Sequence, residues 1–305
     1  MSEANSGPDR VSREQRGHLW LVGLDRAAKR NAMDSALLMD LALALGEYEG
    51  NDELRCMVLF AHGEHFTAGL DLMELAPKLA SGGLHYPEGS IDPWGTRLPR
   101  RSKPVVVAVE GICWTAGIEL LLNADIAIAA SNARFAHLEV LRGIPPSGGS
   151  TVRFTQAAGW ANAMRYMLTG DEFDADQARA MNLVNEVVAP GQALAAPSTM
   201  PNALPGLRRW RSKATLQSAF LARDEGDAAA LARLEETLLE LIGSADVREG
   251  VMAMMQKRAR SSPGADHHDP DDLPGPAARL HLCMPVTVTR CRRTATRLWA
   301  KPVAT

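Results

Sequence analysis

The sequence predicts an α/β protein, because short apolar runs of strand length alternate along the chain with longer segments of helical periodicity. Residues 55–61 (RCMVLFA) and 104–109 (PVVVAV) are typical of buried strands, whereas residues 35–47 repeat leucine at the spacing of one helix face. Strands that alternate with helices usually form a parallel sheet with right-handed crossovers. A chain of 305 residues is long enough to bury a substantial core around such a sheet.

The N-terminal part of the chain reads as a regular succession of strands, helices and loops. Residues 1–17 are polar and charged, and we expect them to form a flexible lead. Asp34 precedes the first helical segment and is a candidate N-cap. Residues 80–103 are rich in Gly and Pro and predict a surface loop over a site. The other expected elements are a strand at 18–24, a polar loop at 25–33, a helix at 35–47, a strand at 55–61, a short helix at 71–79, a strand at 104–109, a helix at 117–123 and a strand at 125–130.

Helical patterns dominate after residue 150. In the segment 227–242, apolar residues recur along one side and predict an amphipathic helix. The members of this stripe are Leu231, Leu234, Leu238 and Leu241. The expected elements are helices at 151–158, 161–169 and 174–181, a last strand at 182–188, and helices at 213–222, 227–242 and 246–258.

Composition and charge argue against several classes of protein. A net charge of −3 gives no sign of a nucleic-acid or membrane partner. The four cysteines lack the spacing of a zinc site or a CxxC motif, which predicts reduced thiols, no bound metal and a cytoplasmic location. The first residues lack the apolar region of a signal peptide, and no uncharged apolar run approaches the roughly 18 residues of a membrane span.

Two glutamates, Glu119 and Glu139, are the strongest candidates for chemistry. Glu119 follows the small-residue turn 115–117 at the start of a predicted helix, where unpaired backbone N–H groups can stabilise a developing oxyanion. Glu139 has apolar neighbours, which make a carboxylate costly to ionise and favour a role in proton transfer. The alternative interpretations are a helix-terminal glutamate for the first and a surface or salt-bridged carboxylate for the second.

Three segments carry a resemblance to a known family. HFTAGLDL (65–72), GICWTAGIELLLNADIAIA (111–129) and FAHLEVLRGIPPSGG (135–149) resemble, in order and spacing, the three signatures of the crotonase superfamily, and within it the enoyl-CoA hydratases. The resemblance extends over about residues 19–188 and 213–257. It implies a spiral of ββα repeats, followed by a C-terminal helical region that packs the chain into trimers or dimers of trimers.

The same resemblance implies an acyl-CoA thioester substrate, with coenzyme A as part of the substrate and no separate cofactor. It places the oxyanion hole at the backbone N–H groups of Ala68 and Ala116. It assigns Glu119 to positioning and activating a water molecule, and Glu139 to proton exchange at C2 of the acyl group. The implied reaction is the reversible addition of water to a trans-2-enoyl-CoA. The acyl chain and the pathway are not fixed by the sequence, and we hypothesise a degradative pathway for fatty acids or branched acids.

The expected contacts with CoA or the acyl chain come from the loop 25–33, the turn 65–72 and the turn that precedes Glu119. Lys29 and Arg30 are candidate phosphate partners, and Lys257 aligns loosely with a lysine that reaches CoA from a neighbouring subunit. Two departures from the family pattern are expected to reshape the acyl pocket: Trp114 narrows it, and the second glutamate follows His137-Leu138 instead of the common Gln-Pro. The full set of expected contacts is Lys29, Arg30, Ala68, Gly69, Asp71, Leu72, Trp114, Gly117 and Lys257.

Two stretches depart from the family. Residues 196–210 contain three prolines where family members have an amphipathic helix, and the tail 259–305 has no periodicity. We hypothesise that both reflect shifted reading frames, which the DNA sequence of the gene would decide. Asp266–Asp269 (DHHD) in the tail is most simply a solvated polar run. The expected organisation is a lead at 1–17, a crotonase-like core at 18–195, an aberrant stretch at 196–212, a C-terminal helical region at 213–258 and a disordered tail at 259–305.

Two other functions stay open at this point. An isomerase or another acyl-CoA lyase of the same superfamily would use the same oxyanion hole with different acid and base groups, and the presence of both glutamates argues against it. A non-catalytic acyl-CoA-binding protein is the second alternative, and the unusual stretches at 196–210 and in the tail favour it.

Overall fold

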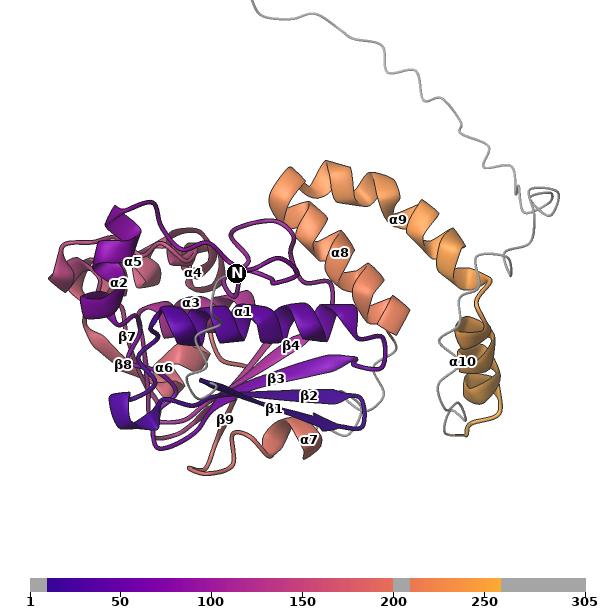
Figure 1. Ribbon diagram of the computed structural model, residues 1–305. Coiled ribbons are helices and arrows are strands. Elements are labelled where there is room, and N and C mark those ends of the chain that lie inside the picture. The colour runs from indigo at the N-terminus through magenta and orange to yellow at the C-terminus, as the bar shows by residue number, and fades with distance from the viewer. Residues whose placement is uncertain (1–9, 200–208, 259–305) are drawn as a thin grey trace, which may run out of the picture. The chain divides into compact units, whose positions relative to one another are not determined.

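The computed structural model describes residues 10–199 and 209–258, and it confirms the α/β fold class (Figure 1). The main sheet has six strands in the order β1-β2-β3-β4-β6-β9. β1 pairs antiparallel with β2, whereas all other neighbours in this sheet are parallel. The strands are β1 (Val11–Arg16), β2 (Leu19–Leu24), β3 (Cys56–Ala61), β4 (Val105–Val109), β6 (Ile126–Ala130) and β9 (Glu186–Val188).

A second sheet has three short strands, and two of them, β5 and β7, shortly precede the two candidate glutamates in the chain. β5 (Ile112–Trp114) pairs parallel with β7 (Arg134–Ala136), and β7 pairs antiparallel with β8 (Glu172–Asp174). The register sets Trp114 opposite Ala136, so the chain leaves β5 and β7 at the same level of the sheet. The sequence analysis missed these strands, because three residues are too few to show a period.

The expected helices are present with small changes of boundary. α1 (Ser35–Gly50) begins after Asp34, whose side chain accepts a 2.9 Å hydrogen bond from the N–H of Leu37, which confirms the predicted N-cap. None of the helices in the described ranges is long and apolar enough to cross a membrane. The other helices are α2 (Leu72–Ala80), α3 (Ala116–Asn123), α4 (Ser150–Ala158), α5 (Trp160–Thr169), α6 (Ala175–Ala180), α7 (Ala196–Thr199), α8 (Arg209–Glu225), α9 (Asp227–Ile242) and α10 (Ala245–Met255).

The main sheet buries side chains on both of its faces, which explains why its central strands are apolar throughout. In β3, Met57 and Leu59 belong to the larger core that includes the leucines of α1, whereas Val58 belongs to a smaller core on the other face. Ala193 and Ala196, at the start of α7, complete that smaller core. Figure 1 shows α1 and α7 on opposite sides of the strands. Burial of both faces is typical of parallel strands in α/β proteins.

The expectation of a flexible lead over residues 1–17 is wrong for its second half, where β1 forms. Val11 is 1% exposed, and β1 returns into β2 through Gly17, which has a φ of 59°. The strand escaped prediction because it lies at the edge of the sheet, where a polar sequence such as VSREQR is tolerated.

Three other expectations concern the C-terminal half of the chain. One of them is corrected by the structure, and the other two fall wholly or partly outside the described residues. The stretch 196–212 contains α7 and the start of α8, while residues 200–208 lie outside the described residues. The strand expected at 182–188 is shortened to β9, and Asn182 has a φ of 61° that no strand residue adopts. The tail 259–305, with its polar run Asp266–Asp269, also lies outside the described residues.

Candidate active site

The junction between β5 and α3 presents unpaired backbone N–H groups. Thr115 connects the two elements with a φ of 50° and a ψ of −115°, a conformation that favours glycine. The first N–H groups of a helix have no acceptor within it, and that of Ala116 finds none elsewhere among the described residues. The N–H of Thr115 donates to the carbonyl oxygen of Ala136 at 2.8 Å, which ties the start of α3 to the end of β7.

Glu119 lies in the first turn of α3 and is only 3% exposed. Its Oε1 accepts hydrogen bonds from the backbone N–H groups of Gly148 at 2.7 Å and Ser150 at 3.2 Å. Burial raises the pKa of Glu119, the bond from Ser150 lowers it, and the charge of Glu139 raises it again, so the net shift is upward. The carboxylate is therefore fixed in position and is a stronger base than an exposed glutamate.

Glu139 shares a pocket with Glu119. It is 6% exposed and immediately precedes η2 (Val140–Arg142). Its Oε2 lies 3.3 Å from Nδ1 of His137, a side chain with no exposed surface. The structure thus brings together, in one pocket, two carboxyl groups that are 20 positions apart in the sequence. The other lining residues are Ala68, Leu70, Leu72, Thr115, Ala116, Arg142, Ile144, Pro145 and Ser147.

The structure corrects one of the two predicted oxyanion donors. The N–H of Ala68 donates to the carbonyl oxygen of Arg30 at 2.9 Å, so it is not available to a ligand. Gly69, which lies between Ala68 and Leu70, has a φ of 90° and takes the chain out of the extended conformation. The sequence motif therefore does not tell which N–H group of this turn faces the pocket.

Leu70 supplies the available N–H group of this turn, and the sequence analysis did not single it out. A parallel bridge joins Met33 to Leu70, but the N–H groups that it uses belong to Met33 and Asp71. The N–H of Leu70 consequently has no acceptor in the described part of the chain. Leu70 and Ala116 both line the pocket of the two glutamates, so their N–H groups are the donor pair that the geometry favours.

Gly69 allows this turn to approach the start of α3 closely. Its φ is 90°, and a Cβ atom built on it would lie 1.8 Å from Oγ1 of Thr115. A side chain at position 69 would therefore force apart the two segments that carry the N–H groups. Gly69, one of the expected contacts with CoA or the acyl chain, thus lies against the side chain of Thr115.

A larger cavity adjoins the glutamate pocket and shares Leu70, Glu119 and Ser147 with it. Leucine and aromatic side chains form most of its wall, and many of them come from the loop 80–103 that was expected to cover a site. Such a wall suits an extended apolar chain bound beside Glu119. The remaining lining residues are Leu38, Leu75, Leu79, Leu84, Tyr86, Asp92, Trp94, Thr96, Arg97 and Gly148.

The tryptophan of this larger cavity is Trp94, which the sequence analysis did not identify. Its Nε1 donates to the carbonyl oxygen of Ala116 at 3.2 Å, so the indole also supports the start of α3. Trp114 lines neither cavity, and its buried Nε1 has no partner in the described part of the chain. The expectation that Trp114 narrows the acyl pocket is therefore wrong, because β5 directs its side chain elsewhere.

The expected contacts with CoA are only partly brought together. Lys29 and Arg30 are exposed, and the hydrogen bond from Ala68 places Arg30 beside the turn 65–72. Leu72 lines the glutamate pocket. The carboxylate of Asp71 instead pairs with Arg26, whose Nη1 lies 2.8 Å from Oδ2, so this aspartate stabilises the turn.

Two further expected contacts lie outside both cavities. A Cβ atom on Gly117 would lie 2.4 Å from Cγ2 of Thr67, which shows that this glycine permits close packing of α3 on the turn 65–72. Lys257 is exposed after the end of α10, and its expected contact involves a neighbouring subunit.

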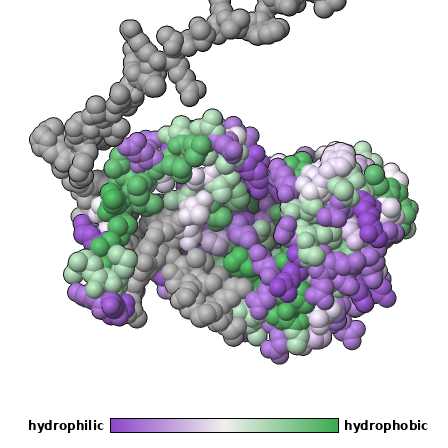
Figure 2. Space-filling model, turned by 180° about the vertical axis from the view of Figure 1, so that it is seen from behind, coloured by the Kyte–Doolittle hydropathy of each residue, from purple (hydrophilic) through white to green (hydrophobic). Residues whose placement is uncertain are grey.

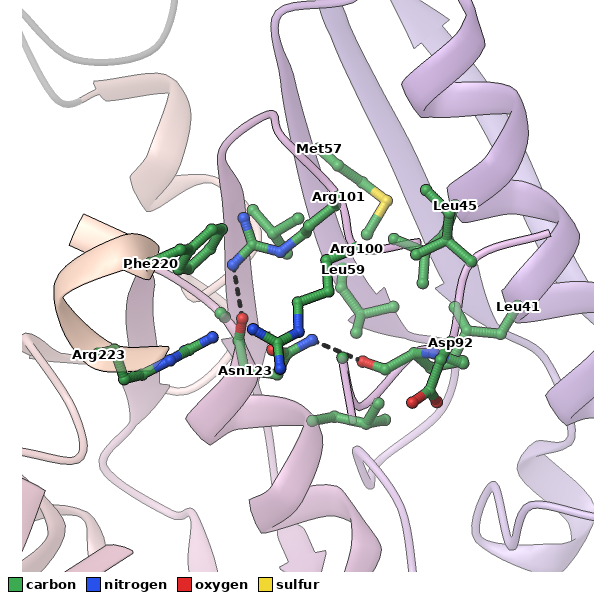
Figure 3. A pocket seen from close by; sticks show the side chains of 16 residues that line it. Leu41, Leu45, Met57, Leu59, Asp92, Arg100, Arg101, Asn123, Phe220 and Arg223 are labelled. Carbon is green, nitrogen blue, oxygen red and sulfur yellow. Dashed lines mark hydrogen bonds between the residues drawn. The ribbon is translucent and has the colours of Figure 1, made fainter. Parts of the chain in front are cut away.

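Figure 3 shows a third cavity, which is rich in arginine and shares no lining residue with the glutamate pocket. Arg101 pairs with Asp125 at 2.7 Å, and its guanidinium lies 5.5 Å from the ring centre of Phe220 in α8. Arg223, also in α8, lies 4.7 Å from the same ring. These contacts connect α8 to the loop before β4 and, through Arg101, to Asp125 before β6, so we interpret this cavity as a packing feature.

Comparisons with known proteins agree with this geometry. A sequence model of the enoyl-CoA hydratase/isomerase family matches residues 14–261, a range that includes both glutamates. Enoyl-CoA hydratase EchA19 of Mycobacterium tuberculosis is 30% identical over 85% of this chain and 98% of its own length. The 2,3-dehydroadipyl-CoA hydratase of Escherichia coli is 33% identical over 81% of this chain and 95% of its own length.

Solved structures give the same result. The crystal structure of a probable enoyl-CoA hydratase/isomerase from Mycobacterium abscessus matches with a TM-score of 0.81 and 45% identity, and the match covers 84% of this chain and 98% of that one. The fold expected from the resemblance is thereby confirmed. The family match ends at residue 261, close to the start of the tail that departs from the family pattern.

Proposed function

Because the chain belongs to the enoyl-CoA hydratase/isomerase family, we propose that it is an enoyl-CoA hydratase that adds water reversibly to a trans-2-enoyl-CoA. One observation carries the proposal: Glu119 and Glu139 line a single buried pocket together with the unpaired N–H groups of Leu70 and Ala116. Two hydrogen-bond donors and two carboxyl groups are the parts that hydration of a double bond conjugated to a thioester requires.

The thioester carbonyl oxygen would accept hydrogen bonds from the N–H groups of Leu70 and Ala116. As water attacks C3, negative charge develops on this oxygen, and each donor aimed at it is worth about 3–4 kcal/mol. Both donors are backbone groups in a buried pocket, so they need no reorganisation when the charge appears. The acyl chain would extend from this point into the larger cavity beside Glu119.

The two glutamates would divide the proton transfers. Glu119 accepts a proton from water as the water oxygen bonds to C3, and Glu139 donates a proton to C2 as the enolate collapses to the thioester. The product gains one hydroxyl and one hydrogen, and exchange with solvent restores the starting protonation of both side chains. The upward pKa shift of Glu119 supports its assignment as the base, because a more basic carboxylate removes the proton of water more readily.

Hydration is favoured over isomerisation by the second glutamate. Moving a double bond needs one group that shuttles a proton, whereas adding water needs a group for the water and a group for C2. Both glutamates are buried and share the pocket, which supports hydration. The two curated relatives above are also named hydratases. The proposed reaction uses no cofactor beyond the CoA of the substrate.

The C-terminal helices support an oligomer as part of the proposal. Five residues of α9 and four of α10 are large, apolar and exposed, and Figure 2 shows apolar surface along these helices. A second or third copy of the chain would cover this surface, so we propose a homotrimer or a dimer of trimers. We also propose a cytoplasmic location in which the buried thiols Cys56 and Cys113 stay reduced. The exposed residues are Leu231, Leu234, Leu238, Leu239, Ile242, Val251, Met252, Met254 and Met255.

Hydration of crotonyl-CoA tests the proposed activity, followed as loss of the absorbance of the conjugated enoyl group. The purified chain should hydrate this substrate, and Glu139→Gln should lower kcat by about 10²–10⁴-fold while the protein stays folded. A folded parent that hydrates neither crotonyl-CoA nor a longer trans-2-enoyl-CoA would overturn the proposal. Sedimentation of the same preparation measures the oligomeric state separately.

A further inference from the structure

The most informative polar group outside the proposed mechanism is the side chain of His137. It has no exposed surface, and its Nδ1 lies 3.3 Å from Oε2 of Glu139. No other residue in the described ranges makes a hydrogen bond to the Glu139 carboxylate. Glu119, in contrast, is held by two backbone N–H groups. The two glutamates therefore differ in what holds them, and a single side chain holds Glu139.

The surroundings of the imidazole determine which nitrogen carries its proton. Nε2 of His137 is buried and has no hydrogen-bond partner among the described residues. A proton on Nε2 would be a buried donor without an acceptor, which costs about 1–3 kcal/mol. We therefore assign the proton to Nδ1, so that the neutral imidazole donates to the Glu139 carboxylate.

The ring itself has little freedom to move. Its centre lies 5.3 Å from that of Phe154 in α4, and Phe154 packs in turn against Phe173 at 6.2 Å. Phe173 also stacks on Phe135 at 5.4 Å. His137 follows β7 directly, so the register of the short sheet fixes its backbone as well. The imidazole is a rigid donor, supported on one side by the aromatic cluster and on the other by Glu139.

We propose that His137 is a positioning residue for Glu139: its Nδ1–H holds Oε2 and leaves the other carboxylate oxygen for C2 of the substrate. This inference rests on the proposed hydratase function. The reaction requires a proton to travel between Glu139 and one carbon atom, and a misplacement of about 1 Å costs about 10²-fold in rate. His137 lines neither the glutamate pocket nor the larger cavity, so it acts through the carboxylate.

Two substitutions separate the hydrogen bond from the packing. His137→Phe keeps a ring against Phe154 and removes the donor. His137→Asn places an amide N–H where Nδ1 lies and removes the rest of the ring. We expect His137→Phe to lower kcat for crotonyl-CoA by about 10²-fold, with KM within about threefold, and to leave Tm unchanged. His137→Asn should retain more of kcat than His137→Phe, although its Tm is lower because a cavity replaces the ring.

The decisive result is that the two variants rank in opposite orders for activity and stability: His137→Asn should be the more active variant and also the less stable one. A merely structural histidine would make the less stable variant the less active one. A second arm places His137→Phe in a Glu139→Gln background, where it should cause no further loss of kcat, because the two residues act as one unit. Equal kcat for parent and His137→Phe, or an additive loss in the double variant, would overturn the role of His137 and leave the hydratase function intact. A folded parent without hydration would instead overturn both.

Discussion

The backbone N–H of Gly148 donates a 2.7 Å hydrogen bond to Oε1 of Glu119, and this bond joins the loop before α4 to the first turn of α3. A Cβ atom at Gly148 would lie 2.5 Å from the other carboxylate oxygen, so only glycine permits this approach. The bond fixes a buried carboxylate in a pocket where burial raises its pKa. This burial of a charged base, which the hydrogen bonds from Gly148 and Ser150 offset only in part, works against folding stability at neutral pH, and the cost can be measured.

Glu119→Gln should lower hydration by about 10²–10⁴-fold and should also raise Tm at pH 8. The native pKa of Glu119 lies above its ordinary value, so the native state loses stability as pH rises through that pKa. Glutamine carries no charge and keeps an oxygen for the N–H groups of Gly148 and Ser150, so it avoids this loss. Differential scanning calorimetry at several pH values would measure the gain.

The gain from Glu119→Gln should shrink as the pH falls and should vanish below the ordinary pKa of the side chain, 4.5, where glutamate is neutral in both states. Glu74→Gln is a suitable control, because Glu74 has a lowered pKa and its substitution should reduce stability at neutral pH. A gain independent of pH would contradict the explanation by burial of charge.

Gly69→Ala should inactivate the enzyme and destabilise it strongly. The added Cβ would lie 1.8 Å from Oγ1 of Thr115, and the φ of 90° is itself unfavourable for alanine. The matched control is Gly83→Ala, where φ is 88° and no atom lies within 4 Å. The control should lose only the roughly 1 kcal/mol of a strained φ. Chemical denaturation of the two variants would be compared, and equal losses would argue against the predicted clash.

Trp94→Ala should shift the preference toward longer or bulkier acyl chains. Trp94 lines the larger cavity beside Glu119, so its removal enlarges that cavity. Trp114→Ala serves as the control, because Trp114 lines neither cavity although it is also partly buried. The measurement is kcat/KM for a series of trans-2-enoyl-CoA substrates of increasing length. A change of length preference in the Trp114 variant alone would restore the interpretation from sequence.

Phe220→Leu should loosen α8 without removing much apolar surface. The guanidinium groups of Arg101 and Arg223 lie 5.5 and 4.7 Å from the centre of the Phe220 ring, and leucine offers no aromatic face to them. Cation–π contacts at partly exposed sites are worth about 0.5–1 kcal/mol each. Hydrogen exchange of the α8 amides should accelerate in this variant and should stay unchanged in the control Gln217→Ala. Unchanged exchange in both variants would mean that other contacts hold α8.

Most of the fold was accessible from the sequence, because long elements repeat a period. α9 was predicted at its observed boundaries, and the N-cap Asp34 was recognised from its residue type and position. Short elements were not accessible: β5 and β7 have three residues each, and β1 is a polar edge strand. Their pairing depends on partners distant in the chain, which no local pattern reveals.

The candidate site was likewise predictable only in part. The two glutamates could be named from the sequence, because a motif fixes the positions of side chains. The direction of each backbone N–H could not, since it depends on the bridge between Met33 and Leu70. The misassigned tryptophan has a similar cause: a motif places Trp114 near the site in sequence, but only the register of β5 decides where its side chain points.

The hydrogen bonds that hold the two glutamates differ in which substitutions would remove them. Glu119 is held by main-chain groups, which every amino acid at Ser150 except proline would also provide. Glu139 is held by an imidazole, which a single nucleotide change in the codon of His137 can replace. A substitution of Ser150 would therefore leave Glu119 in place, whereas a substitution of His137 or of Gly148 would release one of the two glutamates.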